Sequence, residues 1–294
     1  MRILDLQRPQ PGQAYIPVAA GGNGGGGAEQ VSVVIMNWAK PDSVRQIAAS
    51  LAAMAAVGEV LVLHLRQDTT FEFEHPKVSH IVDYNADVRY GLTSRFLGCL
   101  HARHEAVVLQ DDDVMLTEAA LASLLAARAA APAAPLVGLF GRDWPGDAPG
   151  YVMADVGPGR HPVALTVAAL ASRRLCHAFF EFSHLAEPFV RAHSAPYWNG
   201  EDIFLSLVGW KVAGEMPLIV APPQRGYKLL HSHVSGAEGM HTTSPNHAAF
   251  RDALVKVAVK LLNLPTRGNG PPLDAAAADA LLAAGGGAPL AAAV

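Results

Sequence analysis

Three consecutive aspartates, Asp111, Asp112 and Asp113, directly follow a short apolar run of the sequence. Three carboxylates this close together require a neighbouring positive charge, and a divalent cation that carries a diphosphate would supply it. Carboxylate oxygens are hard ligands, which favours Mg²⁺, Mn²⁺ or Ca²⁺ over zinc. On an extended backbone, Asp111 and Asp113 share one side and can face the metal, while Asp112 points to another part of the ligand. A polar loop before the next helix is the alternative interpretation of the triplet.

A second pair of acids, Glu201 and Asp202, follows Asn199 and two aromatic residues, Tyr197 and Trp198. The aromatic rings could form the walls of a site for a sugar. A structural explanation is also available, because Asn199 is a good helix N-cap and acids in the first turn stabilise exposed N–H groups and the helix dipole. Neighbouring residues point in different directions, so one acid can serve the helix while the other faces a cleft.

The composition argues against several classes of protein. About half of the 294 residues are apolar, but much of that fraction is alanine, and no run of about 20 apolar residues could cross a bilayer. The first residues do not begin a signal peptide, because no apolar central region follows them. A net charge of −4 argues against nonspecific binding of nucleic acids. The two cysteines, Cys99 and Cys176, are too few for a disulfide framework or a four-ligand zinc site.

Three regions differ in composition along the chain. Residues 1–30 are rich in Pro and Gly and are expected to form a flexible leader. Residues 263–294 are expected to form a low-complexity tail. Residues 31–262 form the predicted single domain, which is long enough to bury a sizeable core.

Strands and helices alternate in the first half of this domain. Strands are expected at residues 31–36, 59–63, 78–82 and 107–109, and helices from Pro41, near 92–103 and over 117–130. The alternation predicts an α/β fold with a mostly parallel central sheet and helices on both faces. Ligands of such sheets bind beyond the carboxyl ends of the strands, and the three aspartates lie at such an end.

The second half of the domain is less regular. Strands are expected at residues 136–140, 151–153 and 163–169, and helices near 173–182, from the second acidic pair to about 210, and at 246–262. Prolines and glycines between the strands suggest hairpins, so we expect a smaller mixed β region here.

Five segments carry a resemblance to a known family. They are, in chain order, Val33–Pro41, Arg95 sixteen residues before Asp111, Val107–Val114 around the aspartates, Asn199–Ser206 around the second acidic pair, and the weaker His247–Arg251. Together they resemble the exostosin-like glycosyltransferases of glycosyltransferase family 64, over about residues 31–262. The resemblance implies a single domain of the GT-A type.

The resemblance also implies a reaction and a cofactor. Family members transfer an N-acetylhexosamine, GlcNAc or GalNAc, from a UDP-sugar to a glycan or other hydroxyl acceptor, with Mn²⁺ or Mg²⁺ and with retention at the anomeric carbon. They usually act in the Golgi or the endoplasmic reticulum behind an N-terminal anchor. Because the sequence predicts no such anchor, a soluble cytosolic protein is the alternative.

The matched residues take expected roles from that reaction. Asp113 would bind the metal directly, and Asp111 would bind it directly or through water. The other residues expected to contact the substrate are Asp112, Arg95, Asn199 and Lys40. His231 and His233 are a weaker hypothesis for a further metal ligand.

Three residues are expected to act at the reacting atoms. Asp202 would lie beside the anomeric carbon, Glu201 would steady the donor or the acceptor, and Arg251 would stabilise charge on the leaving phosphate. Retention requires either a nucleophilic carboxylate or a pocket that stabilises an oxocarbenium-like state. Without the resemblance, Arg251 and Arg95 would be interpreted as solvated surface residues and Lys40 as a turn residue.

Two features depart from the family pattern. Where the family often has two bonded cysteines, this chain has Gly200 and Leu254, so that bridge is expected to be absent. Where the family has asparagines that touch the uracil, this chain reads His64-Leu-Arg-Gln-Asp68, which changes the expected contact with the base.

Two other functions are compatible with parts of the sequence. A noncatalytic module that binds a nucleotide sugar or a glycan could share the fold without its chemistry. An aspartyl phosphohydrolase of the haloacid-dehalogenase type would use Asp111 and Asp113 as nucleophile and acid. That motif usually ends the first strand of its domain, whereas several strands precede it here, and no later acid lies near Ser206.

Overall fold

The computed structural model describes residues 2–3, 6–9, 12–15, 30–194, 198–223, 226–230 and 246–265. The strands within these residues are β1 (Arg2–Ile3), β2 (Val31–Asn37), β3 (Val57–His64), β4 (Val78–Val82), β5 (Ala106–Gln110), β6 (Val114–Leu116), β7 (Val137–Gly138), β8 (Gly141–Arg142), β9 (Gly159–Arg160), β10 (Val163–Ala164), β11 (Ala168–Ser172), β12 (Leu218–Ile219) and β13 (Tyr227–Leu229). The helices are α1 (Pro41–Ala53), α2 (Ala86–Tyr90), the 3₁₀ turn η1 (Gly91–Thr93), α3 (Ser94–Leu100), α4 (Glu118–Ala130), α5 (Arg173–His193), α6 (Glu201–Ala213) and α8 (His247–Leu261).

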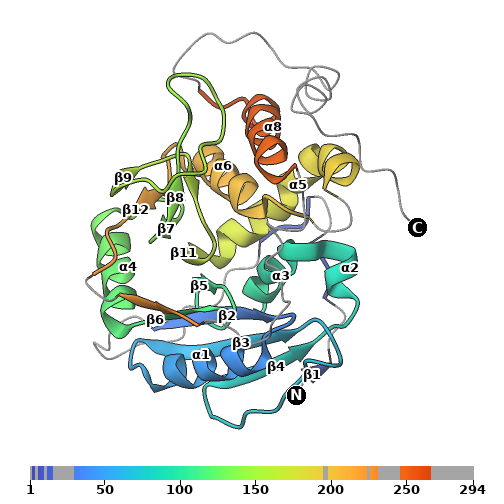
Figure 1. Cartoon of the computed structure of the whole chain (residues 1–294), viewed down its shortest axis with the longest axis vertical. Coiled ribbons are helices and arrows are strands. Elements are labelled where there is room, and N and C mark those ends of the chain that lie inside the picture. Colours follow the sequence, from blue (N-terminus) through green and yellow to red (C-terminus); the bar gives the residue numbers. More distant parts are fainter. Residues whose placement is uncertain are drawn as a thin grey trace.

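One large sheet organises the described part of the chain (Figure 1). Its strand order is β1-β4-β3-β2-β5-β11-β7-β12-β9. The neighbours from β1 to β5 are parallel, β11 is antiparallel to both β5 and β7, and β12 is parallel to β7. Every residue of β2 is buried, which is typical of a parallel strand covered on both faces. The expected α/β class with a mostly parallel central sheet is confirmed.

Helices pack against both faces of this sheet (Figure 1). On one face, buried residues of α1 and α4 contact the strands, among them Val44, Ile47, Leu51, Leu121 and Leu124. On the other face, α3, α5, α6 and α8 bury a second and larger cluster. Helix α1 buries one face, whereas residues 201–209 of α6 are buried on all sides. This burial, rather than intrinsic propensity, stabilises the helices. The expected two layers of helices are therefore also confirmed.

The second half of the sequence was predicted less accurately. Residues 151–153 form no strand, because the Tyr151 N–H donates to the Asp252 side chain instead of a sheet neighbour. The expected strand at 163–169 is divided into β10 and β11. Helix α5 continues past Pro188 to His193, held by the buried face that it presents to its neighbours. The mixed β region is mainly a continuation of the central sheet through β11, with a two-stranded sheet of β10 and β8 beside it.

Short N-terminal segments contact the domain within the stretch expected to be a flexible leader. Strand β1 pairs in parallel with β4 at the end of the sheet. Leu6 is fully buried, and its N–H donates to the Asp83 carboxylate at 2.8 Å. Further along, the Tyr15 hydroxyl donates to Glu105. The burial of Leu6 and hydrogen bonds to Asp83 and Glu105 attach these segments to the domain, which the Pro- and Gly-rich composition around them did not indicate.

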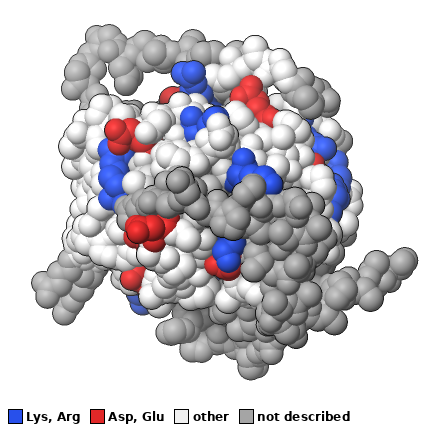
Figure 2. All heavy atoms as spheres, turned by 90° about the horizontal axis from the view of Figure 1, so that it is seen from above, with Lys and Arg blue, Asp and Glu red and all other residues white. Residues whose placement is uncertain are grey.

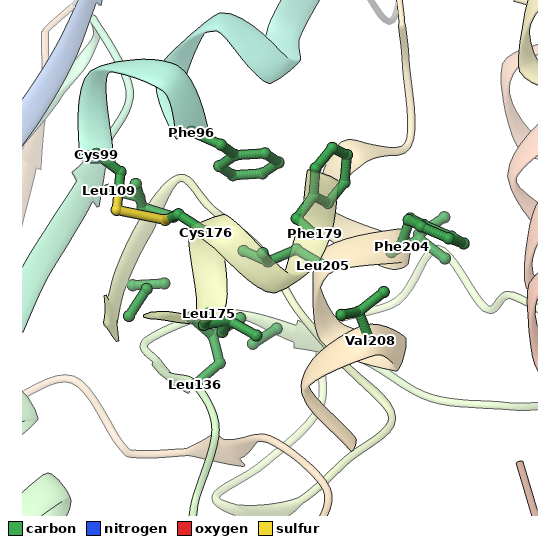
Figure 3. Close-up of a cluster of buried hydrophobic side chains, with 14 of the residues drawn as sticks. Phe96, Cys99, Leu109, Leu136, Leu175, Cys176, Phe179, Phe204, Leu205 and Val208 are labelled. Carbon is green, nitrogen blue, oxygen red and sulfur yellow. A yellow bond between two sulfur atoms is a disulfide. The ribbon is translucent and has the colours of Figure 1, made fainter. Parts of the chain in front are cut away.

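A disulfide joins the two cysteines inside the larger core cluster (Figure 3). Cys99 belongs to α3 and Cys176 to α5, their Cα atoms are 6.4 Å apart, and both side chains are fully buried. The rings of Phe96 and Phe179 pack beside it with centroids 4.6 Å apart. The disulfide therefore covalently links α3, the helix that contains Arg95, to the long helix α5.

Removal of this disulfide is expected to destabilise the protein by about 2–4 kcal/mol, because the bridge closes a long loop of the unfolded chain. Its two cysteines are 77 residues apart in the sequence. Urea unfolding with and without a reducing agent measures the effect, and the Cys99→Ala/Cys176→Ala variant should be equally stable in both conditions. Two reactive thiols in the denatured, unreduced wild-type protein would contradict the bridge.

Candidate active site

The two acidic clusters open onto one cavity of about 440 Å³. The aspartates lie just beyond the carboxyl end of β5, and the second acidic pair begins α6 on the larger helical layer. The nine residues expected to bind the metal or the substrate or to act at the reacting atoms all line this cavity: Lys40, Arg95, Asp111, Asp112, Asp113, Asn199, Glu201, Asp202 and Arg251. Trp198, expected to form a wall for a sugar, does not line it and packs against Phe179 and Phe204 instead. The fold thus brings together residues from β5, α3, α6, α8 and the loop before α1.

Arg95 connects the two acidic clusters. Its Nη1 donates to Asp111 Oδ1 at 2.8 Å and to Thr166 Oγ1 at 2.9 Å. The Thr166 hydroxyl in turn donates to Glu201 Oε1 at 3.2 Å. Arg95 is only 5% exposed, so it is not the solvated surface residue of the alternative interpretation. A continuous set of hydrogen bonds therefore runs from the first cluster to the second.

Asp112 and Asp113 share one cation. Lys40 Nζ donates to Asp112 Oδ1 at 3.1 Å and to Asp113 Oδ2 at 2.8 Å. The two residues form a turn, so the extended backbone expected here, with Asp111 and Asp113 on one side, was wrong. The Gln110 side chain holds that turn, because its amide donates to the carbonyls of Asp111 and Val114.

Arg251 and Asp202 form a buried ion pair, with each side chain 8% exposed. Arg251 also donates to Asn199 Oδ1 at 3.0 Å, and its guanidinium lies 4.9 Å from the centre of the Tyr151 ring. Asn199 does not cap the helix as one interpretation expected. The cap residue is Gly200, whose φ of +82° suits a residue without a side chain, and Asn199 is used to hold Arg251.

Burial and charge together set the ionisation of the cavity. Burial, and then the charge of Asp202, raise the pKa of Glu201 to about 7. Burial also raises the pKa of Asp112 to about 6, against the opposite effect of Lys40. Burial lowers the pKa of Arg95 and of Arg251, but the neighbouring carboxylates outweigh it and raise both values above their ordinary level.

Several buried polar atoms of the cavity have no hydrogen-bond partner among the described residues. They are Arg95 Nε, Glu201 Oε2 and Arg251 Nε. Buried polar groups are nearly always hydrogen-bonded, so a water molecule or a polar ligand is needed to satisfy these atoms. Basic and acidic side chains are interspersed on the face in Figure 2, and the lining of the cavity likewise combines both signs.

Residues 31–262 match the family model of the glycosyl transferase family 64 domain. The chain belongs to this family. No curated protein matches it. A solved structure that is similar is 2-C-methyl-D-erythritol 4-phosphate cytidylyltransferase (IspD) of Francisella tularensis, with 8% sequence identity and a TM-score of 0.42, over 69% of this chain and 95% of that chain.

Membership of family 64 confirms the expected glycosyltransferase class, which moves a sugar from a donor to an acceptor. In the part of the chain that the structure describes, no helix combines the length and the apolar character needed to cross a bilayer. Tyr197, His231 and His233 lie outside the described residues, so their expected roles are not addressed by the structure.

The donor atoms of the aspartates suit a hard divalent ion. Asp111, Asp112 and Asp113 offer carboxylate oxygens at one wall of the cavity. Among the described residues, no group of three or more His, Cys, Asp or Glu side chains is placed to bind a metal ion without further ligands. A site of one or two carboxylates completed by phosphate oxygens of the substrate is the usual arrangement for Mg²⁺, so the residues fit such an ion.

Sequence reasoning missed several residues of the cavity. Thr166 lies within a segment that was expected to be a strand. Its hydroxyl in an otherwise apolar run was the only indication of a role in the site. Arg142 and Tyr151 line the cavity beside Arg251, and Arg142 pairs with Asp155. Neither residue belongs to a sequence motif, because their positions in the cavity depend on the loops between very short strands.

The departure at the family's cysteine positions has a packing explanation. A Cβ atom at Gly200 would lie 2.5 Å from Cδ2 of Leu254. The two positions are therefore in contact across α6 and α8. Leu254 fills the space next to the glycine and is fully buried, so a bulky apolar side chain lies where the family often has the bridge, which is absent as expected.

The stretch expected near the base contains a buried chain of hydrogen bonds. His80 Nε2 contacts the Phe73 carbonyl at 3.1 Å, which can only accept, so this nitrogen carries the hydrogen. His80 Nδ1 then accepts from His64 Nε2 at 2.8 Å, and His64 Nδ1 accepts from Asn37 Nδ2 at 2.9 Å. His64 is fully buried and does not line the cavity, so it holds the strand ends and does not present a base contact.

The stability of the protein in acid is expected to depend on this chain of hydrogen bonds. Burial, and then the neighbouring His80, lower the pKa of His64 to about 4 from 6.5. The unfolded chain takes up that proton at higher pH, so the stability that His64 contributes is present above pH 6.5 and is lost as the pH falls from 6.5 to 4. His64→Gln should flatten the decline of Tm in this range, measured by circular dichroism.

His101→Gln is the matched control, because His101 is exposed. This variant should follow the wild-type dependence of Tm on pH. Parallel declines in the wild type and in His64→Gln would show that His64 does not take up the proton that matters.

Proposed function

We propose that the protein is a metal-dependent retaining glycosyltransferase that moves an N-acetylhexosamine from a UDP-sugar to a hydroxyl acceptor. The observation that supports this most is the convergence of both acidic clusters on one cavity, joined through Arg95. The cavity provides oxygen donors for a metal at one wall and a fixed cation, Arg251, at the other. A charged diphosphate and a sugar require this combination.

Asp113 and Asp111 are the residues that would hold the divalent ion. When bound, such an ion neutralises charge on the departing diphosphate. Asp111 Oδ1 accepts a hydrogen bond from Arg95, so Arg95 fixes the orientation of this carboxylate. Asp112 would contact the donor, as would Lys40 once it is released from the aspartates.

Asp202 and Arg251 would act at the reacting atoms. The Asp202 carboxylate accepts from Arg251 through Oδ2 and from the Ile203 N–H through Oδ1 at 2.8 Å. A carboxylate with both oxygens engaged is a weak nucleophile, which favours electrostatic stabilisation of an oxocarbenium-like state over covalent attack. Arg251 would stabilise the leaving phosphate while remaining paired, and Asn199 would keep its guanidinium oriented.

Glu201 is suited to bind a hydroxyl of the donor or the acceptor. Its Oε1 is occupied by Thr166, and its Oε2 has no partner among the described residues. Burial and the charge of Asp202 raise its pKa, so the group takes up a proton more readily than an ordinary carboxyl and can then donate as well as accept. This adaptability fits a residue that steadies a sugar hydroxyl.

A donor screen tests the proposal. UDP-GlcNAc, UDP-GalNAc, UDP-glucose and UDP-galactose are incubated with the full chain and Mn²⁺, and released UDP is measured with and without EDTA. We expect release from an N-acetylhexosamine donor that EDTA abolishes. Binding of the donor without release would favour the noncatalytic module. Release of phosphate from p-nitrophenyl phosphate, with no release of UDP, would favour the phosphohydrolase.

A further inference from the structure

Two ion pairs of the cavity differ in how firmly they are held. The side chains of Arg251 and Asp202 are each 8% exposed. Lys40 is 17% exposed, and its partners Asp112 and Asp113 are 21% and 42% exposed. Water and salt screen partly exposed pairs and weaken them. Lys40 can therefore leave its partners more easily than Arg251 can.

The backbone of Lys40 is part of the start of α1, whereas its side chain is held only through the hydrogen bonds of its ammonium group to Asp112 and Asp113. Lys40 precedes Pro41 at the start of α1, and its carbonyl accepts from the Val44 N–H at 3.0 Å. Its ammonium group is carried on a flexible four-carbon stem, unlike the planar guanidinium of arginine. The ammonium can move within the cavity without any change in α1.

The ammonium and a metal ion would compete for the same oxygens. Lys40 Nζ lies 2.8 Å from Oδ2 of Asp113, the residue proposed as the direct ligand. A divalent ion bound by Asp113 would lie close to that position, and two cations so close together repel each other. The aspartates can therefore be neutralised by Lys40 or by the metal, and binding of the metal favours departure of the lysine.

We propose that Lys40 is a built-in counter-ion that occupies the metal position of the aspartates before metal binding and is displaced when the metal binds. This inference depends on the proposed function, because it assumes that Asp113 holds the metal. The displaced ammonium would remain in the cavity, beside Trp38 and Ala39, where a diphosphate would be its new partner. Metal binding would thus prepare the site for the donor.

Titration of the full chain with Mn²⁺ in the absence of nucleotide tests this inference, with free Mn²⁺ measured by electron paramagnetic resonance. Lys40→Met should bind Mn²⁺ about five- to tenfold more tightly than the wild type, because no ion pairs have to be broken. With saturating Mn²⁺, the same variant should bind UDP more weakly. Lys211→Met, an exposed residue outside the cavity, removes the same charge and should match the wild type in both measurements.

Equal or weaker binding of Mn²⁺ by Lys40→Met, together with loss of binding in Asp113→Asn, would overturn the role of Lys40 and leave the proposed metal site intact. No difference between the wild type and Asp113→Asn would overturn both. Lys40→Gln guards against a folding defect of Lys40→Met, because its amide can still donate to the aspartates. Its affinity for Mn²⁺ should lie between those of the wild type and Lys40→Met.

Discussion

Asp202→Asn is expected to lower kcat by about 10³-fold, because the substitution removes the negative charge proposed to stabilise the developing positive charge of the sugar. The shape of the side chain remains, but the amide oxygen can accept from only one of the two donors, the Arg251 guanidinium and the Ile203 N–H, that the carboxylate now serves. The same substitution leaves Arg251, which is 7% exposed, without its counter-charge. Breaking a buried pair from one side costs about 3–5 kcal/mol, so the variant should also unfold at lower urea concentration.

A second variant separates the two effects. Asp202→Asn/Arg251→Met removes both charges, so it should recover much of the lost stability. It should recover none of the rate, because both proposed groups are absent. Asp42→Asn is the matched control, since Asp42 also lies in the first turn of a helix, α1, but is exposed. A double variant as active as the wild type would contradict the catalytic role of the pair.

Asp113→Asn is expected to weaken Mn²⁺ binding by about 10- to 100-fold and to lower metal-dependent release of UDP by about 10²-fold or more. The amide that replaces the carboxylate carries no charge and is a poorer ligand for a hard cation. Asp113 is 42% exposed, so the substitution should change Tm little, which makes a loss of activity interpretable.

Asp147→Asn changes the charge by the same amount in an exposed loop and should leave metal affinity and rate unchanged. The metal titration and the UDP assay are carried out on both variants. If Asp113→Asn releases UDP as fast as the wild type at every Mn²⁺ concentration, Asp113 is not the metal ligand.

The first half of the fold was predictable because its signals are local. Strands β2 to β5 are long enough to show runs of apolar, mostly β-branched residues, α1 begins at Pro41, and Thr117 caps α4. The short elements β1, β6 and α2 were not predicted. In the second half, β7, β9 and β12 have two residues each, and their pairing partners are distant in the sequence. Such strands form because of tertiary contacts, so the sequence shows no alternation of apolar and polar residues that would predict them.

The residues of the site were predictable, but several of their partners were not. The rule that ligands bind beyond the carboxyl ends of parallel strands was enough to predict the edge of the sheet at which the aspartates line a cavity. The alternation of side chains failed at Asp112 because Gln110 closes a turn there. Asn199 looked like a helix cap because its residue type allows both roles, and only the position of Arg251 decides between them. The bridge between Cys99 and Cys176 depends on how α3 meets α5, which neither helix indicates alone.

Strand β1 has a consequence for attempts to shorten the protein. It is two residues long and pairs with Ile81 and Val82 of β4, which would otherwise be the last strand of the large sheet. An uncovered strand of this kind exposes free N–H and C=O groups that template self-association. Trimming the chain to residues 31–262, the span of the family 64 match, would uncover β4 and remove the buried Leu6. The trimmed protein would then be prone to aggregate through this exposed edge, even with every residue of the cavity intact.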